Sequence, residues 1–339
     1  MKRLIGLILA LSFLLAGCAQ TQPGSKQYTA TFLTLFDTVT TIVGFAETEE
    51  EFQVQTQAIH DDLMVYHQLF DIYNDYEGIN NLKTVNDQAG IAPVEVDPAI
   101  IELLTDCRTY YDMTNGLVNA AMGSMLHLWH VARNAGINDP VNAALPSMEK
   151  LEEAAGHMDF DAVIIDKDAS TVFLADPEMS LDVGAIAKGW ATQRAAENAP
   201  AGMLISVGGN VCATGPKTAA GDPWVIGMQN PDGGDSIHTI YVTGGAVVTS
   251  GDYQRVYYVE NNPYHHIIDP STRMPATYWR SVTVVCEDSG LADALSTALF
   301  LLPQEMGQAL AEQCGANALW IGVDGSEFMT PGFREMIRT

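Results

Sequence analysis

The hydrophobic pattern changes from strand-like to helix-like within the first 70 residues. Residues 29–45 are rich in Thr, Val, Ile and Phe, which predicts a pair of strands or one long strand. From residue 47 to residue 70, apolar side chains between Phe52 and Phe70 recur mostly at helical spacing after an acidic first turn. We therefore expect a strand segment followed by a long helix.

Helix and turn signals continue up to residue 198. Capping residues, Gly stops and polar turns divide this region into separate elements. The expected elements are a helix over residues 98–113 that ends near Asn115-Gly116, a helix over 147–155 with Ser147 as its cap and Gly156 as its stop, a hairpin over 161–174 around an Asp-Lys-Asp turn, and an Ala-rich helix over 184–198.

The remaining chain is mostly strand and turn, with two helices near its end. Strands are expected over residues 203–207, 224–228, 237–242, 246–250, 255–259, 281–286 and 318–323, and helices over 290–302 and 303–314. Strands and helices arrive in clusters and do not alternate strictly. An α+β domain, with mixed or antiparallel sheets and packed helices, is therefore favoured over a doubly wound parallel sheet.

The first residues have the pattern of an export signal. Met1-Lys2-Arg3 is basic, residues 4–16 are apolar, and Leu15-Ala16-Gly17 leads directly into Cys18. This resembles a bacterial lipoprotein signal, which implies that residues 1–17 are removed and that Cys18 is lipidated; the alternative is a plain secretory signal. Residues 18–27 would then be a tether, residues 28–339 one domain, and the protein would be lipid-anchored on the extracytoplasmic face of the cell membrane.

Composition narrows the classes of partner. The hydrophobic share of 47% allows a sizeable core, and the formal net charge of −26 argues against nucleic acid as a partner. An acidic protein that holds a polyphosphate ester needs a cation to offset the repulsion. The widely spaced cysteines argue against a zinc site and a disulfide framework; besides Cys18 they are Cys107, Cys212, Cys286 and Cys314.

One polar pair interrupts an apolar helix near the end of the chain. Residues 291–300 are nearly all apolar, yet Asp293 and Thr297 lie four residues apart and so share a helix face. A carboxylate in such surroundings is costly unless it is paired or binds a cation, and a carboxylate beside a hydroxyl suits magnesium. The alternative is that Asp293 favours the helix dipole while Thr297 bonds back to a carbonyl.

Other polar residues lie at predicted strand ends. Residues 180–190 turn from a strand into a helix through small residues, so backbone N–H groups there could hold an anion, with Asp182 and Lys188 as side-chain contacts; the alternative is tight packing. Residues 249–253 gather hydroxyls and a carboxylate. Of the neighbouring His265 and His266, at most one is expected to face a site, as a base or phosphate donor.

Several familiar motifs are absent, and the motifs that are present resemble one family. The sequence has no serine-hydrolase elbow, no G-x-x-x-x-G-K loop and no H-E-x-x-H. In order along the chain, eight segments resemble the ApbE family of FAD:protein FMN transferases. They are Phe36-Asp37-Thr38-Val39-Thr40, residues 70–86, 115–129, 181–191, 206–215, 249–253, 265–270 and 281–300.

The resemblance implies one α+β, T-fold-like domain that holds FAD in a cleft with magnesium at its pyrophosphate. It implies magnesium binding by Asp293, Thr297 and the backbone carbonyl of Ala185. It also implies an FAD site formed by Phe36, Tyr73, Val118, Asn119, Ala120, Asp182, Lys188, His266 and Ile267.

The implied reaction transfers the FMN half of FAD to a Thr or Ser hydroxyl of an exported or membrane-bound client and expels AMP. His266 is the first candidate for the base, followed by Asp293 and Asp252. The rival interpretations are hydrolysis of FAD to FMN and AMP, an FAD-binding lipoprotein that scavenges the cofactor without chemistry, and a structural lipoprotein without a ligand.

The chain departs from the common family pattern at three places. Asp37 stands where glycine is usual, Asn119-Ala120-Ala121 replaces an Asp-Pro-Thr-like triplet, and Arg273 stands where glycine is usual. These changes bear on the details of flavin contact, whereas Asp293, Thr297 and His266 are all retained.

Overall fold

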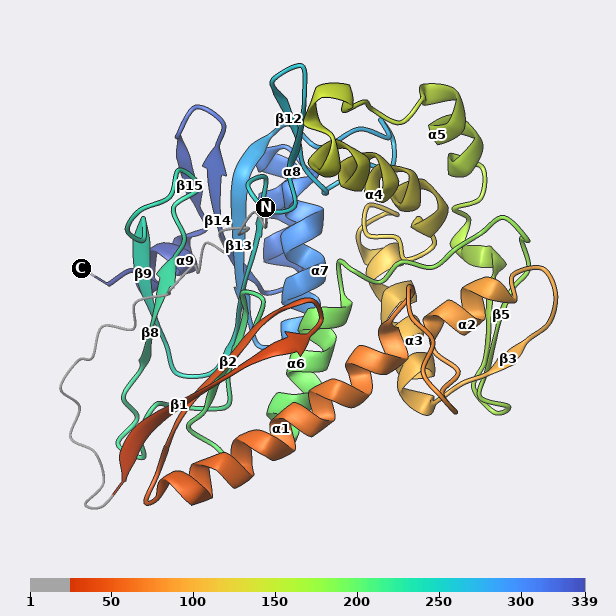
Figure 1. The fold of residues 1–339 in the computed structure, drawn as a ribbon. Coiled ribbons are helices and arrows are strands. Elements are labelled where there is room, and N and C mark those ends of the chain that lie inside the picture. The colour runs from red at the N-terminus through yellow and green to blue at the C-terminus, as the bar shows by residue number, and fades with distance from the viewer. Residues whose placement is uncertain (1–24, 339) are drawn as a thin grey trace, which may run out of the picture.

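The computed structural model describes residues 25–338 and contains an antiparallel sheet of eight strands, seen in the left half of Figure 1. Its strand order is β1-β2-β6-β7-β10-β13-β14-β15, so strands far apart in sequence become neighbours. The strands are β1 (Lys26–Leu35), β2 (Thr38–Ala46), β6 (Leu204–Val207), β7 (Asn210–Ala213), β10 (Gly245–Gly251), β13 (Trp279–Cys286), β14 (Asn317–Gly322) and β15 (Glu327–Met329).

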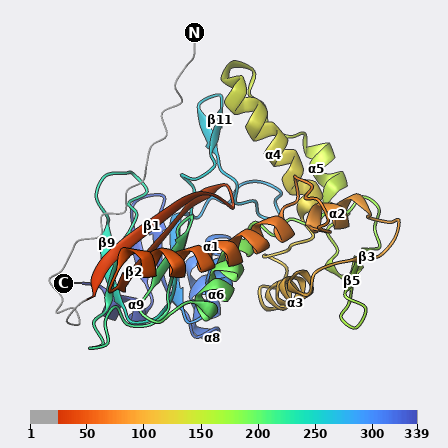
Figure 2. The ribbon, with the colours of Figure 1, turned by 60° about the horizontal axis from the view of Figure 1, so that its bottom comes forward.

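Helices cover one face of this sheet. α7 (Ser289–Phe300) packs on β10 and β13 and also against α6 (Ala187–Asn198), with α8 (Gln304–Gln313) and the long α1 (Glu49–Phe70) beside them (Figures 1 and 2). Leu295 and Leu299 of α7 are fully buried in this layer. Because α7 has protein on most sides, its apolar sequence is explained by burial.

A smaller hairpin covers the opposite face. β8 (Trp224–Met228) pairs with β9 (His238–Val242), and α9 (Pro331–Met336) lies next to them. Trp224, Ile240 and Phe333 fill the space between this layer and the sheet. The middle strands of the central sheet are therefore buried on both faces, whereas most of the edge strand β1 is exposed or only partly buried.

The segments that lie between α1 and α6 in sequence form a lobe at one end of the sheet (Figure 1). It contains a small three-stranded sheet, short 3₁₀ turns and four helices. The hairpin β11–β12, which comes later in the sequence, also packs against α4. The elements are α2 (Leu82–Asp87), β3 (Val94–Glu95), α3 (Pro98–Met113), α4 (Gly123–Asn138), η1 (Pro140–Asn142), α5 (Met148–Ala155), η2 (Phe160–Ala162), β4 (Val163–Asp166), β5 (Thr171–Leu174), β11 (Tyr257–Val259) and β12 (Asn262–Tyr264).

The expected α+β class and antiparallel sheets are confirmed, and most expected elements are present. α3 has the expected bounds because Asp97 caps it, Pro98 begins it, and Asn115 and Gly116 end it with positive φ. α4 was not predicted. Its N-terminus follows Met122 without a side-chain cap, so the sequence carries no start signal there.

The N-terminal expectations are only partly within the described residues. The signal at residues 1–17 and lipidated Cys18 lie outside residues 25–338. The tether was expected to extend to residue 27, but Lys26 and Gln27 already pair with β2 in the sheet, which corrects that boundary. Within the described part of the chain, no helix combines the length and apolar character needed to cross a bilayer.

Two departures from the family pattern fall at left-handed backbone positions. Asp37, between β1 and β2, has φ 52°, and Arg273 has φ 62°. Side chains with a Cβ adopt this conformation at a cost, which explains why glycine suits both places. The four cysteines of the described residues are free, as expected from their spacing.

Candidate active site

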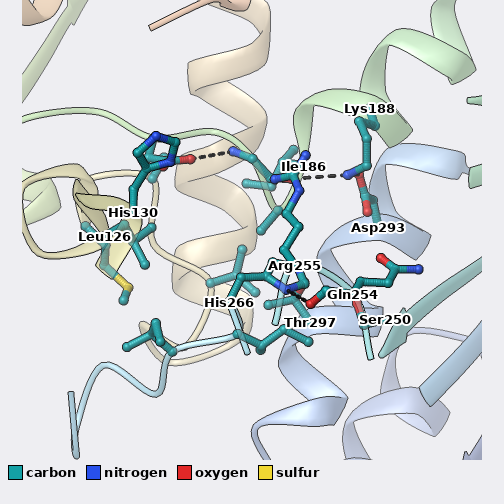
Figure 3. Close-up of a pocket in the computed structure, with 18 of the residues that line it drawn as sticks. Leu126, His130, Ile186, Lys188, Ser250, Gln254, Arg255, His266, Asp293 and Thr297 are labelled. Carbon is teal, nitrogen blue, oxygen red and sulfur yellow. Dashed lines mark hydrogen bonds and ion pairs between the residues drawn. The ribbon is translucent and has the colours of Figure 1, made fainter. Parts of the chain in front are cut away.

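A cavity of about 350 Å³ lies where the lobe meets the central sheet and its helices. Lys188 and Asp293 lie at one end, Leu126 and His130 at the other, and Arg255 and His266 between them (Figure 3). The volume is within the range of small-molecule sites. The pocket brings together eleven of the expected site residues, namely Tyr73, Val118, Asn119, Ala120, Asp182, Ala185, Lys188, His266, Ile267, Asp293 and Thr297.

Asp293 is a buried carboxylate held by three donors. Its Oδ2 accepts hydrogen bonds from the backbone N–H of Gly189 at 2.8 Å and the side-chain amide of Asn210 at 2.9 Å, and the ammonium of Lys188 lies 3.5 Å away. Burial raises the pKa of the carboxyl, and Lys188 and the two hydrogen bonds oppose that rise. The side chain is thus fixed in one orientation by α6 and β7.

Three oxygen atoms at this end have no hydrogen-bond partner among residues 25–338. They are Oδ1 of Asp293, the hydroxyl of Thr297 and the carbonyl of Ala185. The Ala185 carbonyl lacks the usual helical donor because the N–H of Gly189 bonds to Asp293 instead. The alternative in which Thr297 bonds back to a carbonyl is not observed in this part of the chain.

These oxygens have the chemistry of a hard-cation site. Carboxylate, hydroxyl and carbonyl oxygens suit magnesium, which completes its coordination with water or phosphate oxygens. Within residues 25–338 no group of three or more His, Cys, Asp or Glu side chains is arranged to hold a metal ion, and this set contains only one such side chain, Asp293. The residues present therefore fit a magnesium ion.

His266 lies in the wall of the pocket, whereas His265 points elsewhere. Nδ1 of His266 donates to the carbonyl of Gln254 at 3.1 Å, which leaves Nε2 as the acceptor of the neutral ring. Burial, with Arg255 as the next cause, lowers the pKa of His266 to about 3. His265 bonds to the Ala276 carbonyl and packs on Phe300, so only one of the two histidines faces the pocket, as expected.

The far end of the pocket combines an aromatic surface with charged groups. Tyr73 stacks on His130 with ring centroids 5.1 Å apart, and a guanidinium nitrogen of Arg133 lies 3.0 Å from Nδ1 of His130. Burial raises the pKa of Tyr73 to about 12, with Asp182 as the next cause. Asp182 itself accepts a hydrogen bond from the N–H of Gly184. This end offers a flat ring and donors for a nucleotide.

Two expected site residues do not line the pocket. Phe36 packs edge-on against His67. Asp252 forms an ion pair with Arg280 at 2.8 Å, and burial raises the pKa of its carboxyl. Neither residue therefore lines the cavity, and His266 and Asp293 are the candidate bases that do.

Sequence reasoning missed Asn210, Arg133 and Arg255, all of which line the pocket. Asn210 follows Gly208 and Gly209, which form a left-handed turn with φ values of 58° and 95°, but its contact with Asp293 spans 83 residues. Arg133 lies on the helix that was not predicted. The scarcity of basic residues, 16 Lys and Arg against 42 Asp and Glu, was the one signal that could have drawn attention to both arginines.

Comparison with known proteins identifies the family. The model of the ApbE family matches residues 36–320. The FAD:protein FMN transferase of Treponema pallidum is 34% identical over 277 residues, covering 76% of this chain and 75% of that protein. The chain belongs to the ApbE family. The crystal structure of the ApbE protein from Thermotoga maritima has 31% identity and a TM-score of 0.81, covering 93% of this chain and 100% of the other.

A more distant ApbE structure shares the fold. The flavin transferase ApbE from Vibrio cholerae is 22% identical and has a TM-score of 0.75, covering 92% of this chain and 99% of the other. The resemblance to the ApbE family and the expected fold are thus confirmed across nearly the whole described domain.

Proposed function

We propose that this chain transfers the FMN half of FAD to a threonine or serine hydroxyl of a client protein and releases AMP. One observation carries the proposal: the three unpartnered oxygens at Asp293, Thr297 and Ala185 share a pocket with Lys188 and His266. ApbE-family relatives with 34% and 31% identity bear the name FAD:protein FMN transferase.

Magnesium is the proposed metal, held by the Asp293 carboxylate, the Thr297 hydroxyl and the Ala185 carbonyl. When bound, it neutralises the pyrophosphate and the charge that grows on the departing AMP. Lys188 lies 3.5 Å from Asp293 and donates to the Gly184 carbonyl, so its charge also stands at this end of the pocket. Oriented cations at the phosphates are the main requirement of phosphoryl transfer.

In the proposed reaction the client hydroxyl oxygen bonds to the FMN phosphorus. The bond from that phosphorus to the bridging oxygen breaks, and AMP leaves with the electron pair. The hydroxyl proton passes to Nε2 of His266, which is free because Nδ1 donates to the Gln254 carbonyl. Burial lowers the pKa of His266, so its imidazole is neutral at pH 7 and Nε2 is available as an acceptor.

The proposed setting is the extracytoplasmic face of the cell membrane, with a lipid on Cys18 as the anchor. Clients would then be exported or membrane-bound proteins that carry the acceptor Thr or Ser. Cys18→Ala should move the protein from the membrane fraction to the soluble fraction. Finding the unsubstituted protein in the cytoplasm with Cys18 unmodified would contradict this part of the proposal.

The deciding experiment incubates the purified protein with FAD, Mg²⁺ and an exported flavoprotein domain, then weighs both proteins and assays AMP. A gain of one FMN moiety on the client, with one AMP released, is the expected result. Free FMN and AMP without a labelled client would instead indicate hydrolysis, and intact bound FAD would indicate a scavenger.

A further inference from the structure

Three cationic side chains of this acidic protein line the pocket. Arg133, Lys188 and Arg255 all line it, in a chain with 16 basic and 42 acidic residues. Lys188 lies beside Asp293, whereas Arg133 and Arg255 lie in the part of the pocket that the proposed metal does not occupy. The pocket is also lined by the carboxylates of Asp37, Asp182 and Asp293, so a bound anion is called for only where a guanidinium group lacks a carboxylate partner.

Neither arginine has a carboxylate partner. No carboxylate oxygen lies within 4.0 Å of a guanidinium nitrogen of Arg133 or Arg255 among residues 25–338, although other arginines, such as Arg108 and Arg280, do form ion pairs there. Arg133 is half-buried, and its guanidinium group contacts Nδ1 of the neutral His130. A half-buried charge without a counter-ion is costly, so this site is built for a charged ligand.

Contacts along α4 hold the guanidinium group of Arg133 in place. His130 is one turn before Arg133 on α4 and is itself fixed by the stacked ring of Tyr73 and by Asn134 at 2.8 Å. Arg255 follows Gln254, whose carbonyl accepts the hydrogen bond from His266. Figure 3 shows Arg255 between His266 and Ile186, facing the interior of the pocket. The two cations therefore approach one region from α4 and from the segment after β10.

We propose that Arg133 and Arg255, with His130 as a positioning residue, form a subsite beside the metal site that binds one phosphate of the FAD pyrophosphate through side chains alone. This inference rests on the proposed function, because it takes FAD as the ligand. Arginine binds phosphate through two parallel hydrogen bonds, which the half-buried position of Arg133 strengthens. The subsite lets the protein hold FAD before the metal is bound.

The test measures binding in EDTA, so that the metal contributes nothing. Dissociation constants for FAD, AMP and FMN are measured by calorimetry for the wild type, Arg133→Gln, Arg255→Gln and the double variant. Arg108→Gln, which removes an arginine of α3 that does not line the pocket, is the matched control. Thermal melting checks that each variant is folded, and Arg133→Lys tests partial rescue.

We expect FAD binding to weaken about tenfold for each single variant, with no change for Arg108→Gln. Weakening of AMP binding alone places the adenosine phosphate at the subsite, and weakening of FMN binding alone places the flavin phosphate there; either supports the inference. Unchanged AMP and FMN affinities in the folded double variant overturn it. Failure of the proposed function would give a different result: the wild-type protein would bind FAD but would not transfer FMN to a client.

Discussion

The backbone N–H of Gly189 donates a 2.8 Å hydrogen bond to the carboxylate of Asp293, so α6 and α7 meet directly at the candidate metal site. This contact needs glycine. A Cβ at Gly189 would lie 2.3 Å from the Ser289 carbonyl oxygen and 2.4 Å from Cβ of Asp293. The two helices can approach closely enough to share the site only because no side chain separates them.

Gly189→Ala should therefore push α6 and α7 apart. We expect it to destabilise the protein by roughly 3 kcal/mol and to weaken magnesium binding, because the added methyl group meets backbone atoms that cannot rotate away. Urea unfolding measures the first effect. Gly307→Ala in α8 is the matched control, since its Cβ would meet Trp320 at 3.4 Å and alanine favours the helix. Equal stability of Gly189→Ala and wild type would contradict this interpretation.

Asn210 orients the same carboxylate from β7. Removing its amide in Asn210→Ala leaves Asp293 with fewer donors in a buried place, so we expect a loss of about 1–3 kcal/mol in stability. Magnesium affinity, measured by calorimetry, should fall about 10- to 100-fold because the ligand is no longer held in one orientation. Asn198→Ala, which removes an exposed hydrogen bond to Asp62, should change neither quantity.

The lowered pKa of His266 predicts a pH dependence of stability. Its pKa is about 3 in the folded protein, and about 6.5 is usual in an unfolded chain. Between these values the unfolded state binds the extra proton, so His266 makes the protein less stable as the pH falls from about 6.5 towards 3, by at most about 1.4 kcal/mol per pH unit.

Replacing the imidazole should therefore flatten the acid side of the stability curve. Urea unfolding at pH 7, 6 and 5 should show a smaller loss for His266→Gln than for wild type. His127→Gln, in which an exposed histidine of α4 is replaced, serves as the comparison and should retain the wild-type slope. A slope for His266→Gln identical to that of wild type would show that this histidine is not buried as a neutral ring.

Arg273 occupies a position that favours glycine. Its φ of 62° is costly for a side chain with a Cβ, and its Nε is buried without a hydrogen-bond partner among residues 25–338. The hydrogen bond from Trp129 goes to the backbone carbonyl of Arg273 and survives substitution. Arg273→Gly should raise stability by about 0.5–1 kcal/mol, measured by thermal and urea unfolding.

The control for this substitution is Lys167→Gly. Lys167 is exposed in the turn between β4 and β5, and its φ is not positive, so glycine there should lower stability slightly. A fall in stability for Arg273→Gly as large as that for Lys167→Gly would mean that the left-handed backbone carries no cost at this position.

Local signals explain which parts of the fold the sequence predicts. Asp97, Pro98 and Asn115 bound α3 through short-range chemistry, and all of that chemistry is visible in the sequence. The N-terminus of α4 has no side-chain cap, so no local signal in the sequence indicates where this helix begins. The pair Asp293 and Thr297 was predicted to share a face of α7 because helical periodicity places residues four apart together.

Contacts across the chain could not be predicted in the same way. The donors to Asp293 from Gly189 and Asn210 are 104 and 83 residues away in sequence, and strand order in the sheet brings them together. The position of Asp252 also depends on a contact that is distant in sequence. Its carboxylate lies near the predicted site in sequence, but Arg280 of the adjacent β13 pairs with it outside the pocket.

The most direct test of the central claim is the mass of a client protein after incubation with FAD, Mg²⁺ and each of three forms of the enzyme. Wild type and Asp252→Asn should each add one FMN moiety, because Asp252 does not line the pocket. Asp293→Asn should add none, since it keeps the shape but removes the charge that holds the metal. Labelling by Asp293→Asn at the wild-type rate would contradict the account.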